Sequence, residues 1–489
     1  MSFAELWESL LPVGRAPETA GYRRYSWTQA DLACRDWFRA AAAQRGLRTE
    51  CDRNGNLWAW WVPALGDSGS SAGDGGSSAG DGGSFPGDGG SSAGDWVPAA
   101  GDTVPSDDTP GPDAPEPSVA LAPHAVGAIV TGSHLDSVPD GGAFDGPLGI
   151  ISAFAALDLL RSRGFVPARP IAIAAFTEEE GARFGVACLG SRLAAGAIEP
   201  TTARELRDGS GVSLAEAMTS AGLDPARIGP DDERLAGLAA CVELHIEQGS
   251  ALAGLGAPVG IAEGIWPHGR WRLEFTGRAD HAGTTRIADR HDPMLPYAAA
   301  VLAARQAAVG RGGLATFGKV VVEPGGANAI CSSVQAWLDA RAPDEATVGL
   351  IVDDVSAAAQ AAALDQGVGF SLRRESFTPL VLFDTGLRDR IGRVLAAAGG
   401  AAMGGTAAGG AGAGGGLGRD SAAVNPPVPV LPTGAGHDAG ILAARLPTAM
   451  LFVRNPSGVS HSPAEHAEPA DCEAGVAALA AVLADLAGS

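Results

Sequence analysis

The chain contains 489 residues, 46% of them hydrophobic, and carries a formal net charge of -22 at pH 7. A chain of this length and hydrophobic content can bury a large core and is expected to form more than one domain. The strongly negative charge argues against nucleic acid or an anionic membrane as a partner. Six cysteines without a Cys-x-x-Cys pair, and an N-terminus without a basic segment or an apolar core, predict a soluble cytoplasmic protein with free thiols.

Two segments have compositions that predict loops. Residues 64–118, which follow an expected strand at 56–61, are rich in Gly, Ser, Asp and Pro and contain ten acidic residues but no Lys or Arg. A Ser-Ala-Gly-Asp-Gly-Gly-Ser unit recurs within them every seven residues, without the apolar positions that a coiled coil requires. We expect this insertion to be disordered and a Gly/Ala-rich stretch at 398–418 to form a surface loop.

The next apolar run is followed by a histidine and carboxylates. Residues 125–131 predict a buried strand, and His134, Asp136 and Asp145 come soon after it. Active sites of α/β sheets open at the carboxyl ends of strands, so His134 is expected at such a rim. Neutral imidazole and carboxylate oxygen suit zinc and related metals such as manganese, cobalt or nickel. The cluster therefore predicts the beginning of a metal site.

A second strand, expected at 171–176, is followed by three adjacent glutamates, Glu178, Glu179 and Glu180. Crowded carboxylates repel one another and take up protons unless a cation or open solvent is near. Taken alone, the three glutamates could equally be a solvated helix start, where acidic side chains favour the helix dipole. Because His134 and Asp145 are expected nearby, a metal site explains the three glutamates better than a solvated helix start does.

Two further histidines extend the candidate set. His245 lies in a strand-like alternation, three residues before Gln248, and His461 lies on a turn near the C-terminus. A lone histidine is more often structural than a ligand. The chain has only nine histidines, however, and most of them fall in motifs typical of turns or strand ends.

The part of the chain from 255 to 376 has a different organisation. Its pattern predicts the order strand, helix, strand, strand, helix, strand, which describes a βαββαβ module. The expected ranges are 271–275, 293–309, 314–322, 334–340, 344–364 and 368–374.

Seven motifs together carry a resemblance to a known family. They are, in chain order, GSHLDSVPDGGAFDG, EEEGARFG, ELHIEQG, GRADHAGTT, GGANAI, LPTGAGHDA and GVSHSPAE. The sequence resembles the dinuclear metal-dependent amidohydrolases that include allantoate amidohydrolases, N-carbamoyl-L-amino-acid hydrolases and β-ureidopropionases, within the zinc aminoacylase and carboxypeptidase superfamily. The resemblance implies an α/β fold with a mixed-sheet, zinc-peptidase-like catalytic domain in two parts, 1–254 and 377–489. It also implies that 255–376 form an inserted, ferredoxin-like lid and dimerisation domain.

The resemblance implies two divalent metal ions per subunit, zinc or manganese, with cobalt or nickel as alternatives. Asp145 would bridge the two ions. His134 and His245 would complete one site, and Glu180 and His461 the other. Glu179 would take a proton from the attacking water and return it to the leaving nitrogen.

Asp136 is expected to orient the imidazole of His134 without binding the metal itself. The plain alternative is that Asp136 is a turn-forming aspartate. His437 and Asp438, in a Gly-rich turn, could touch the metal ligands, but the five ligand positions are already assigned without them.

Substrate binding falls, by the same resemblance, mainly to the inserted module. His281 would act in catalysis, and His281 and Asn328 would bind the oxyanion or the substrate. Arg341 would clamp a substrate carboxylate, which suits a bidentate guanidinium. The plain alternatives are that Arg341 pairs with Asp339 or Asp344 and that Asn328 is a turn residue. Weaker candidates for the same pocket are Gln248, Ser457 and Gly458.

The resulting prediction is a hydrolase that cleaves a carbon–nitrogen bond in a small ureido-substituted carboxylate. His245 stands where the peptidase branches usually have a carboxylate, which favours ureido or carbamoyl substrates over peptides. Two motifs, at 266–270 and 452–456, favour allantoate as the substrate, with N-carbamoyl-L-amino acids or a β-ureido acid as alternatives. A remote alternative is a metal-binding relative without turnover, against which Glu179 argues. A homodimer formed through the lid is expected.

Overall fold

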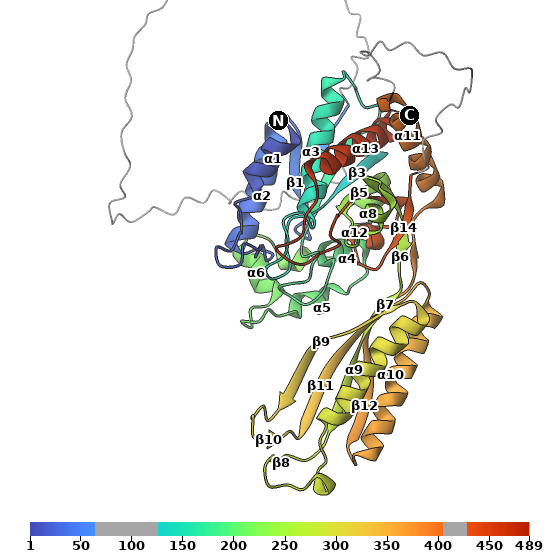
Figure 1. Ribbon diagram of the computed structural model, residues 1–489. Helices are drawn as coiled ribbons and strands as arrows, with labels where there is room; N and C mark the ends of the chain where they lie inside the picture. The colour runs from blue at the N-terminus through green and yellow to red at the C-terminus, as the bar shows by residue number, and fades with distance from the viewer. Residues whose placement is uncertain (64–125, 404–427, 489) are drawn as a thin grey trace, which may run out of the picture.

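The computed structural model describes residues 1–63, 126–403 and 428–488 (Figure 1). The predicted insertion at 64–118 and positions 404–418 of the predicted Gly/Ala-rich loop lie outside these residues. The loop prediction was wrong at its start, because 398–403 belong to helix α11 (Thr385–Met403).

A nine-stranded mixed sheet forms the larger domain, with the strand order β1-β2-β4-β3-β5-β15-β6-β13 and with β14 paired to β6. The strands are β1 (Arg48–Cys51), β2 (Leu57–Trp61), β3 (Ala128–His134), β4 (Ile171–Phe176), β5 (Leu238–Ile246), β6 (Val259–Ile265), β13 (Val381–Leu382), β14 (Val430–Thr433) and β15 (Thr448–Val453). The central strands β4, β3, β5 and β15 are parallel neighbours. They are buried almost throughout, which explains why they are continuous apolar runs in the sequence.

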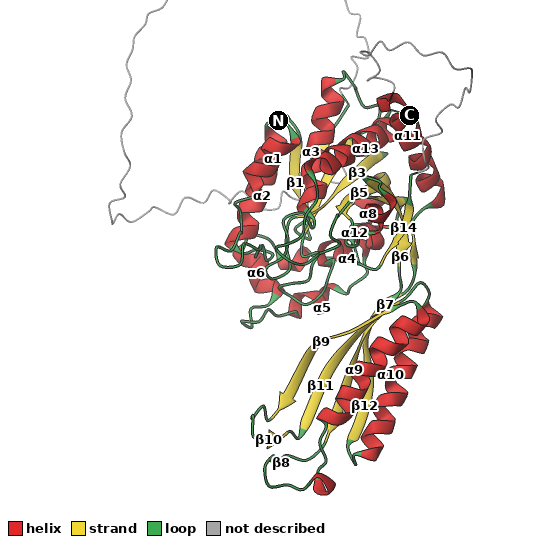
Figure 2. Ribbon diagram, in the orientation of Figure 1, coloured by secondary structure: helices red, strands yellow, loops and turns green. Residues whose placement is uncertain are grey.

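Helices cover both faces of this sheet (Figure 2). One face packs against α1 (Phe3–Leu10), α2 (Gln29–Ala43), α3 (Pro147–Ser162), α11 and α13 (Pro469–Ala487). The other face packs against α7 (Asp232–Gly237) and α12 (Asp438–Leu442). The shorter helices of this domain are α4 (Leu189–Ala195), α5 (Pro200–Glu205), α6 (Leu214–Ser220) and α8 (Ala251–Leu255). The arrangement leaves the ends of the parallel strands as the place where polar loops can meet.

The smaller domain is a four-stranded antiparallel sheet with the order β12-β7-β11-β9, covered on one face by two helices (Figure 2). Its elements are β7 (His268–Thr276), α9 (Met294–Arg311), β9 (Leu314–Glu323), β11 (Ser333–Arg341), α10 (Glu345–Asp365) and β12 (Gly369–Thr378). This is the βαββαβ order that the sequence predicts. A two-stranded ribbon, β8 (Asp280–His281) with β10 (Ala329–Ile330), lies at the end of the domain away from the larger sheet (Figure 1).

Helix α10 is long and apolar enough to cross a membrane by length and composition, alone among the helices of the described ranges. Its buried residues, which include Val348, Ile351 and Val355, form one face of the helix and pack on the four-stranded sheet. Asp353 and Asp354 interrupt its apolar sequence. The packing is that of a helix covering a sheet.

Candidate metal centre

The parallel strands bring the predicted metal ligands to one edge of the large sheet. His134 is the last residue of β3, the glutamates follow β4, and His245 is the next-to-last residue of β5. Asp145 lies two residues before the start of α3, and His461 lies in the loop between β15 and α13. Because β4, β3, β5 and β15 are parallel neighbours, their carboxyl ends meet at the same rim. His134 belongs to the strand itself, whereas the sequence predicted that the strand ends earlier.

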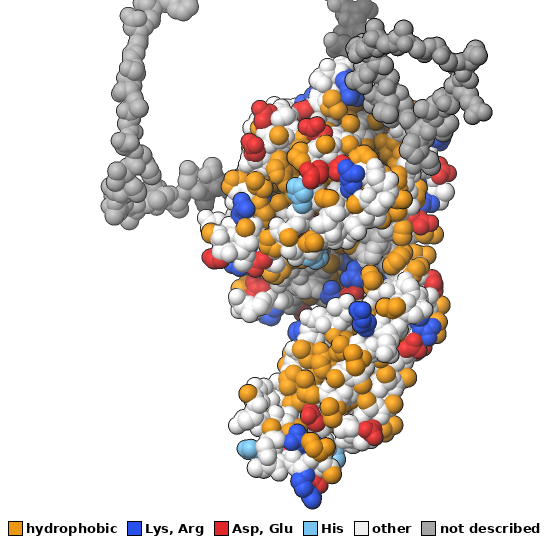
Figure 3. All heavy atoms as spheres, in the orientation of Figure 1, with side chains coloured by type: hydrophobic (Ala, Val, Ile, Leu, Met, Phe, Trp, Pro, Cys, Tyr) orange, Lys and Arg blue, Asp and Glu red, His pale blue; other side chains and the backbone are white. Residues whose placement is uncertain are grey.

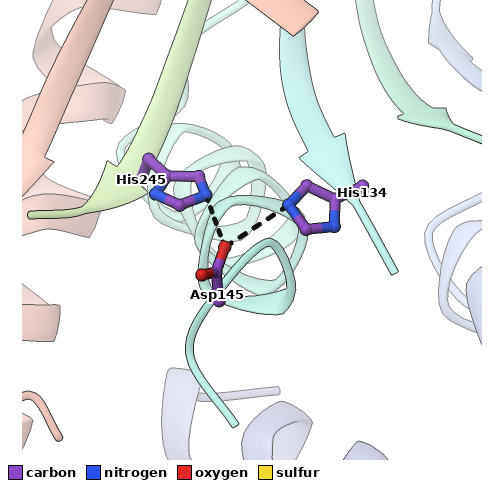
Figure 4. Close-up of side chains that lie close together, drawn as sticks. All are labelled: His134, Asp145 and His245. Atoms are coloured by element: carbon purple, nitrogen blue, oxygen red, sulfur yellow. Dashed lines mark ion pairs between the residues drawn. The ribbon is translucent and has the colours of Figure 1, made fainter. Parts of the chain in front are cut away.

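One group of ligands consists of His134, Asp145 and His245 (Figure 4). The Asp145 Oδ1 atom lies 3.6 Å from His134 Nε2 and 3.1 Å from His245 Nε2. The Nδ1 atoms of the two imidazoles lie 3.1 Å and 2.9 Å from backbone carbonyls, those of Asp136 and Ile246 respectively. An Nδ1 atom that donates its hydrogen to a carbonyl leaves the Nε2 atom of the same ring unprotonated. The lone pair of Nε2 is then available to a metal ion beside Asp145.

A second group uses the other oxygen of the same aspartate. Asp145 Oδ2 lies 3.4 Å from His461 Nε2, and Glu180 Oε2 lies 3.5 Å from the same nitrogen. The Gln248 amide donates to Asp145 Oδ2 at 2.8 Å. Asp145 thus stands between two groups of ligands, which is the arrangement expected of a bridging carboxylate.

The donor atoms fit divalent metal ions. Three of them, His134 Nε2, His245 Nε2 and Glu180 Oε1, are buried without a hydrogen-bond partner within the part of the chain that the structure describes. Buried polar atoms without partners are costly, and a cation would satisfy these. Imidazole nitrogen and carboxylate oxygen are ligands for zinc and, with more oxygens, for manganese.

The electrostatics of the cluster point the same way. Burial and the neighbouring Asp145 carboxylate raise the pKa of Glu180 to about 8. Burial disfavours the charged form of Asp145, but the imidazoles of His134 and His245 outweigh burial and hold the pKa of Asp145 well below its usual range. Within one cluster, the pKa of Glu180 is raised and the pKa of Asp145 is lowered. Such opposite shifts of neighbouring carboxylates are typical of a functional site.

Glu179 lies beside the first group. Its Oε2 atom is 3.6 Å from His134 Nε2, and its Oε1 atom accepts a hydrogen bond from the Cys188 thiol at 3.3 Å. Burial raises the pKa of Glu179 well above its usual value. A buried carboxylate that reaches the candidate metal ligands and binds protons readily is suited to proton transfer.

The alternative of a solvated helix start at these glutamates is wrong. Glu178 is fully buried, Glu179 is 6% exposed, and α4 begins only at Leu189. Glu178 has a structural role, because its Oε1 atom accepts hydrogen bonds from the backbone N–H groups of Arg183 and Phe184.

Asp136 does more than the sequence predicted. Its Oδ1 atom lies 3.6 Å from His134 Nδ1, which fits the predicted support of the imidazole. Its two carboxylate oxygens also accept hydrogen bonds from the backbone N–H groups of Glu179 and Glu180, at 3.2 Å and 3.1 Å. One side chain therefore orients the histidine at the end of β3 and the glutamate loop after β4.

Two further residues contact the candidate ligands: Glu465, which had no predicted role, and His437, which the sequence predicted could touch the metal ligands. Glu465, in the GVSHSPAE motif, accepts hydrogen bonds from the backbone N–H groups of Phe144 and Asp145. The His437 ring packs edge-on against His245, with centroids 4.5 Å apart, and its buried Nε2 atom has no partner among the described residues. Burial lowers the pKa of His437 well below its usual value, so the ring is neutral.

The three residues that were weaker candidates for the substrate pocket lie near the cluster of metal ligands. Gln248 contacts Asp145 directly. Ser457 and Gly458 donate their backbone N–H groups to the Asn455 side chain. An added Cβ on Gly458 would meet Ser250 at 3.0 Å, so this loop runs beside the one that follows Gln248.

Arg341 makes the ion pair with Asp339 that the sequence left open as an alternative, at 2.7 Å. It also contacts the catalytic domain through the Gly434 carbonyl.

His281 and Asn328 are not brought to the cluster of their own chain. His281 is exposed on β8 and pairs across the ribbon with Ala329, next to the exposed Asn328. The ribbon lies at the far end of the smaller domain (Figure 1). The roles of both residues stay predictions. In a single chain, neither residue lies beside the candidate metal ligands.

Comparison with known proteins agrees with the geometry. Residues 130–413 and 419–485 match Peptidase family M20/M25/M40. The N-carbamoyl-L-amino acid amidohydrolase of Geobacillus stearothermophilus is 37% identical over 354 residues, which are 72% of this chain and 80% of the relative. The allantoate amidohydrolase of Bacillus subtilis is 32% identical over 361 residues, 73% of this chain and 81% of the relative.

Among solved structures, a hydantoinase/carbamoylase family amidase from Burkholderia vietnamiensis aligns with a TM-score of 0.73 and 25% identity, covering 100% of this chain and 98% of that one. The chain therefore belongs to Peptidase family M20/M25/M40, and it is a hydrolase that acts on carbon–nitrogen bonds.

Proposed function

We propose that this hydrolase cleaves a ureido-substituted carboxylate, with allantoate as the first candidate, and that it uses two divalent metal ions held by His134, Asp145, Glu180, His245 and His461. The observation that carries the proposal is the position of Asp145 between two groups of ligands, in which His134 Nε2, His245 Nε2 and Glu180 Oε1 are buried without a hydrogen-bond partner among the described residues.

Bound metal ions would polarise the ureido carbonyl and lower the pKa of a water molecule. The protein supplies the proton transfer, because Glu179 lies beside His134 and its raised pKa suits it to accept a proton at Oε2 and pass it to the leaving nitrogen. Asp136 supports this step by fixing the backbone of Glu179 through its N–H group.

N-carbamoyl-L-amino acids are the second candidate substrates. Relatives named for carbamoyl amino acids are 37% and 33% identical, whereas those named for allantoate in Bacillus subtilis and Escherichia coli are 32% and 29% identical. Both substrate types carry a carboxylate and a ureido carbonyl. The motifs at 266–270 and 452–456 favour allantoate, while overall identity favours carbamoyl amino acids.

Ammonia release from purified protein tests the substrate class. The protein is reconstituted with manganese, zinc, cobalt or nickel and supplied with allantoate or with a panel of N-carbamoyl-L-amino acids. We expect turnover of allantoate. Turnover of carbamoyl amino acids alone would move the assignment to the second candidate. Failure to cleave any compound with any metal would contradict the proposed substrate class.

We further propose a homodimer formed through the smaller domain. Strand β9 is an edge strand, and the opposite edge strand β12 carries Arg373, Arg374 and Glu375, which discourage pairing. Strand β9 and the adjacent helix α9 instead expose Leu302, Val309, Leu314, Val320 and Val321. Figure 3 shows hydrophobic side chains gathered on this domain. Such a surface suits a second copy of the chain.

A further inference from the structure

Arg341 lies where the smaller domain meets the catalytic domain, and two groups hold its guanidinium. Asp339 accepts hydrogen bonds from Nε at 2.7 Å and from Nη2 at 3.1 Å. The Gly434 carbonyl accepts a third hydrogen bond from Nη1 at 2.5 Å. A guanidinium has five N–H groups, so one N–H group remains on each terminal nitrogen.

Arg341 donates to a loop that leads to the candidate metal centre, and its side chain is partly exposed. Gly434 follows β14 and precedes His437 by three residues, and the His437 ring packs on His245. The Arg341 side chain is 28% exposed, so a ligand can reach it.

Asp339 and Arg341 share one face of β11. They alternate with Leu338 and Ala340, which are buried against the helices, so both polar side chains lie on the sheet face that the helices leave uncovered. His268 pairs with Arg341 across the strands, and burial, followed by the charge of Arg341, lowers the pKa of His268. His268 is therefore neutral, and Asp339 is the carboxylate that balances Arg341.

We infer that Asp339 is a positioning residue: it holds the Arg341 guanidinium so that its two remaining N–H groups receive the substrate carboxylate. This inference rests on the proposed function. A flexible arginine must be ordered when a ligand binds, whereas one already held by a bidentate ion pair is ordered beforehand. Asp339 thus contributes to carboxylate recognition without touching the substrate.

Binding measurements in the Glu179→Gln background test the inference without requiring turnover. Calorimetry compares N-carbamoyl-L-alanine with its carboxamide on manganese-loaded protein. We expect Asp339→Ala to weaken binding of the carboxylate by about tenfold and to leave the carboxamide unchanged. Adding Asp339→Ala to Arg341→Ala should cause no further loss, because Asp339 acts only through the arginine.

Arg270→Ala is the matched control, since it removes the more distant ion pair of Asp339, at 3.7 Å, and leaves Arg341 in place. It should bind both ligands like the parent. With Glu179 restored, Asp339→Ala should raise KM and change kcat by less than about twofold. A merely structural aspartate would weaken both ligands equally, and that result would overturn the inference.

The outcomes separate this inference from the proposed function. If the native protein cleaves the ureido substrates but Asp339→Ala binds the carboxylate normally, the inference fails and the function stands. If the native protein cleaves none of them but Asp339→Ala removes a preference for the carboxylate, the inference stands and the function fails. Absence of any binding to either ligand would overturn the inference, and the cleavage assay with allantoate and the carbamoyl amino acids would then decide the function.

Discussion

At the scale of single residues, neighbouring glutamates of one loop have different tasks because their partners differ. Glu178 accepts two backbone hydrogen bonds and shapes the loop, whereas Glu179 faces His134 and Glu180 faces His461. Three identical side chains in a row give no sign of this division in the sequence. The folded loop decides it: Glu178 has a φ of 55°, and its carboxylate accepts hydrogen bonds from the backbone of Arg183 and Phe184.

Replacing Glu179 with Gln removes the proton acceptor but keeps the size of the side chain. We expect turnover to fall by about 10²- to 10⁴-fold, the usual contribution of a general base. Metal content, measured by elemental analysis, should stay at the native level, because Glu179 is not among the proposed ligands.

Glu178→Gln is the matched control, since the glutamine oxygen can still accept the two backbone hydrogen bonds. It should retain most of the activity. Full turnover by the Glu179→Gln variant would show that the proton is carried by another group, and loss of both metals from it would make Glu179 a ligand.

At the scale of elements, strand ends and helix starts set the geometry of the centre. Gly146 links Asp145 to α3 with a φ of 84°, and a Cβ added there would lie 2.4 Å from the His134 ring. Gly132, inside β3, allows the close approach of β4, since its Cβ would lie 1.9 Å from the Ala174 carbonyl oxygen. Both glycines are therefore required by packing between elements.

Gly146→Ala should displace the His134 imidazole and lower metal affinity by at least about tenfold, since supporting contacts of metal ligands are typically worth that much. The measurement is metal binding by calorimetry, together with thermal unfolding to confirm that the variant is folded. Gly209→Ala is the control, because open space surrounds Gly209 and its backbone is unstrained. Native metal affinity in a folded Gly146→Ala variant would contradict the packing argument.

At the scale of the whole molecule, the position of His281 has a consequence for the proposed dimer. His281 is exposed at the end of the smaller domain, away from the cluster of its own chain. If His281 is catalytic, it must reach the site of a second subunit or travel far with its domain. The proposed dimer makes the first arrangement possible.

Mixing two inactive variants distinguishes these arrangements. Subunits with His281→Ala and subunits with Glu179→Gln should regain activity when they are unfolded and refolded together, because one site of each mixed dimer would have both residues. Each variant refolded alone should stay inactive. Adding Val321→Glu to both should prevent the recovery and yield monomers by light scattering, because burying a charge in the proposed apolar interface is costly. No recovery from a confirmed mixed dimer would assign His281 to its own subunit.

The sequence by itself determined the family, the βαββαβ module and the five candidate ligands. Local periodicity predicts the module. The five candidate ligands follow from the resemblance, which rests on short motifs that contain them. Tertiary structure decided the partners that are distant in the chain. It placed Glu465 on the N–H group of Asp145, joined Asp136 to the glutamate loop, brought Arg341 to the Gly434 carbonyl, and left His281 far from the metal ligands of its own chain. Those contacts depend on how strands and domains pack, which the spacing of residues along the chain does not encode.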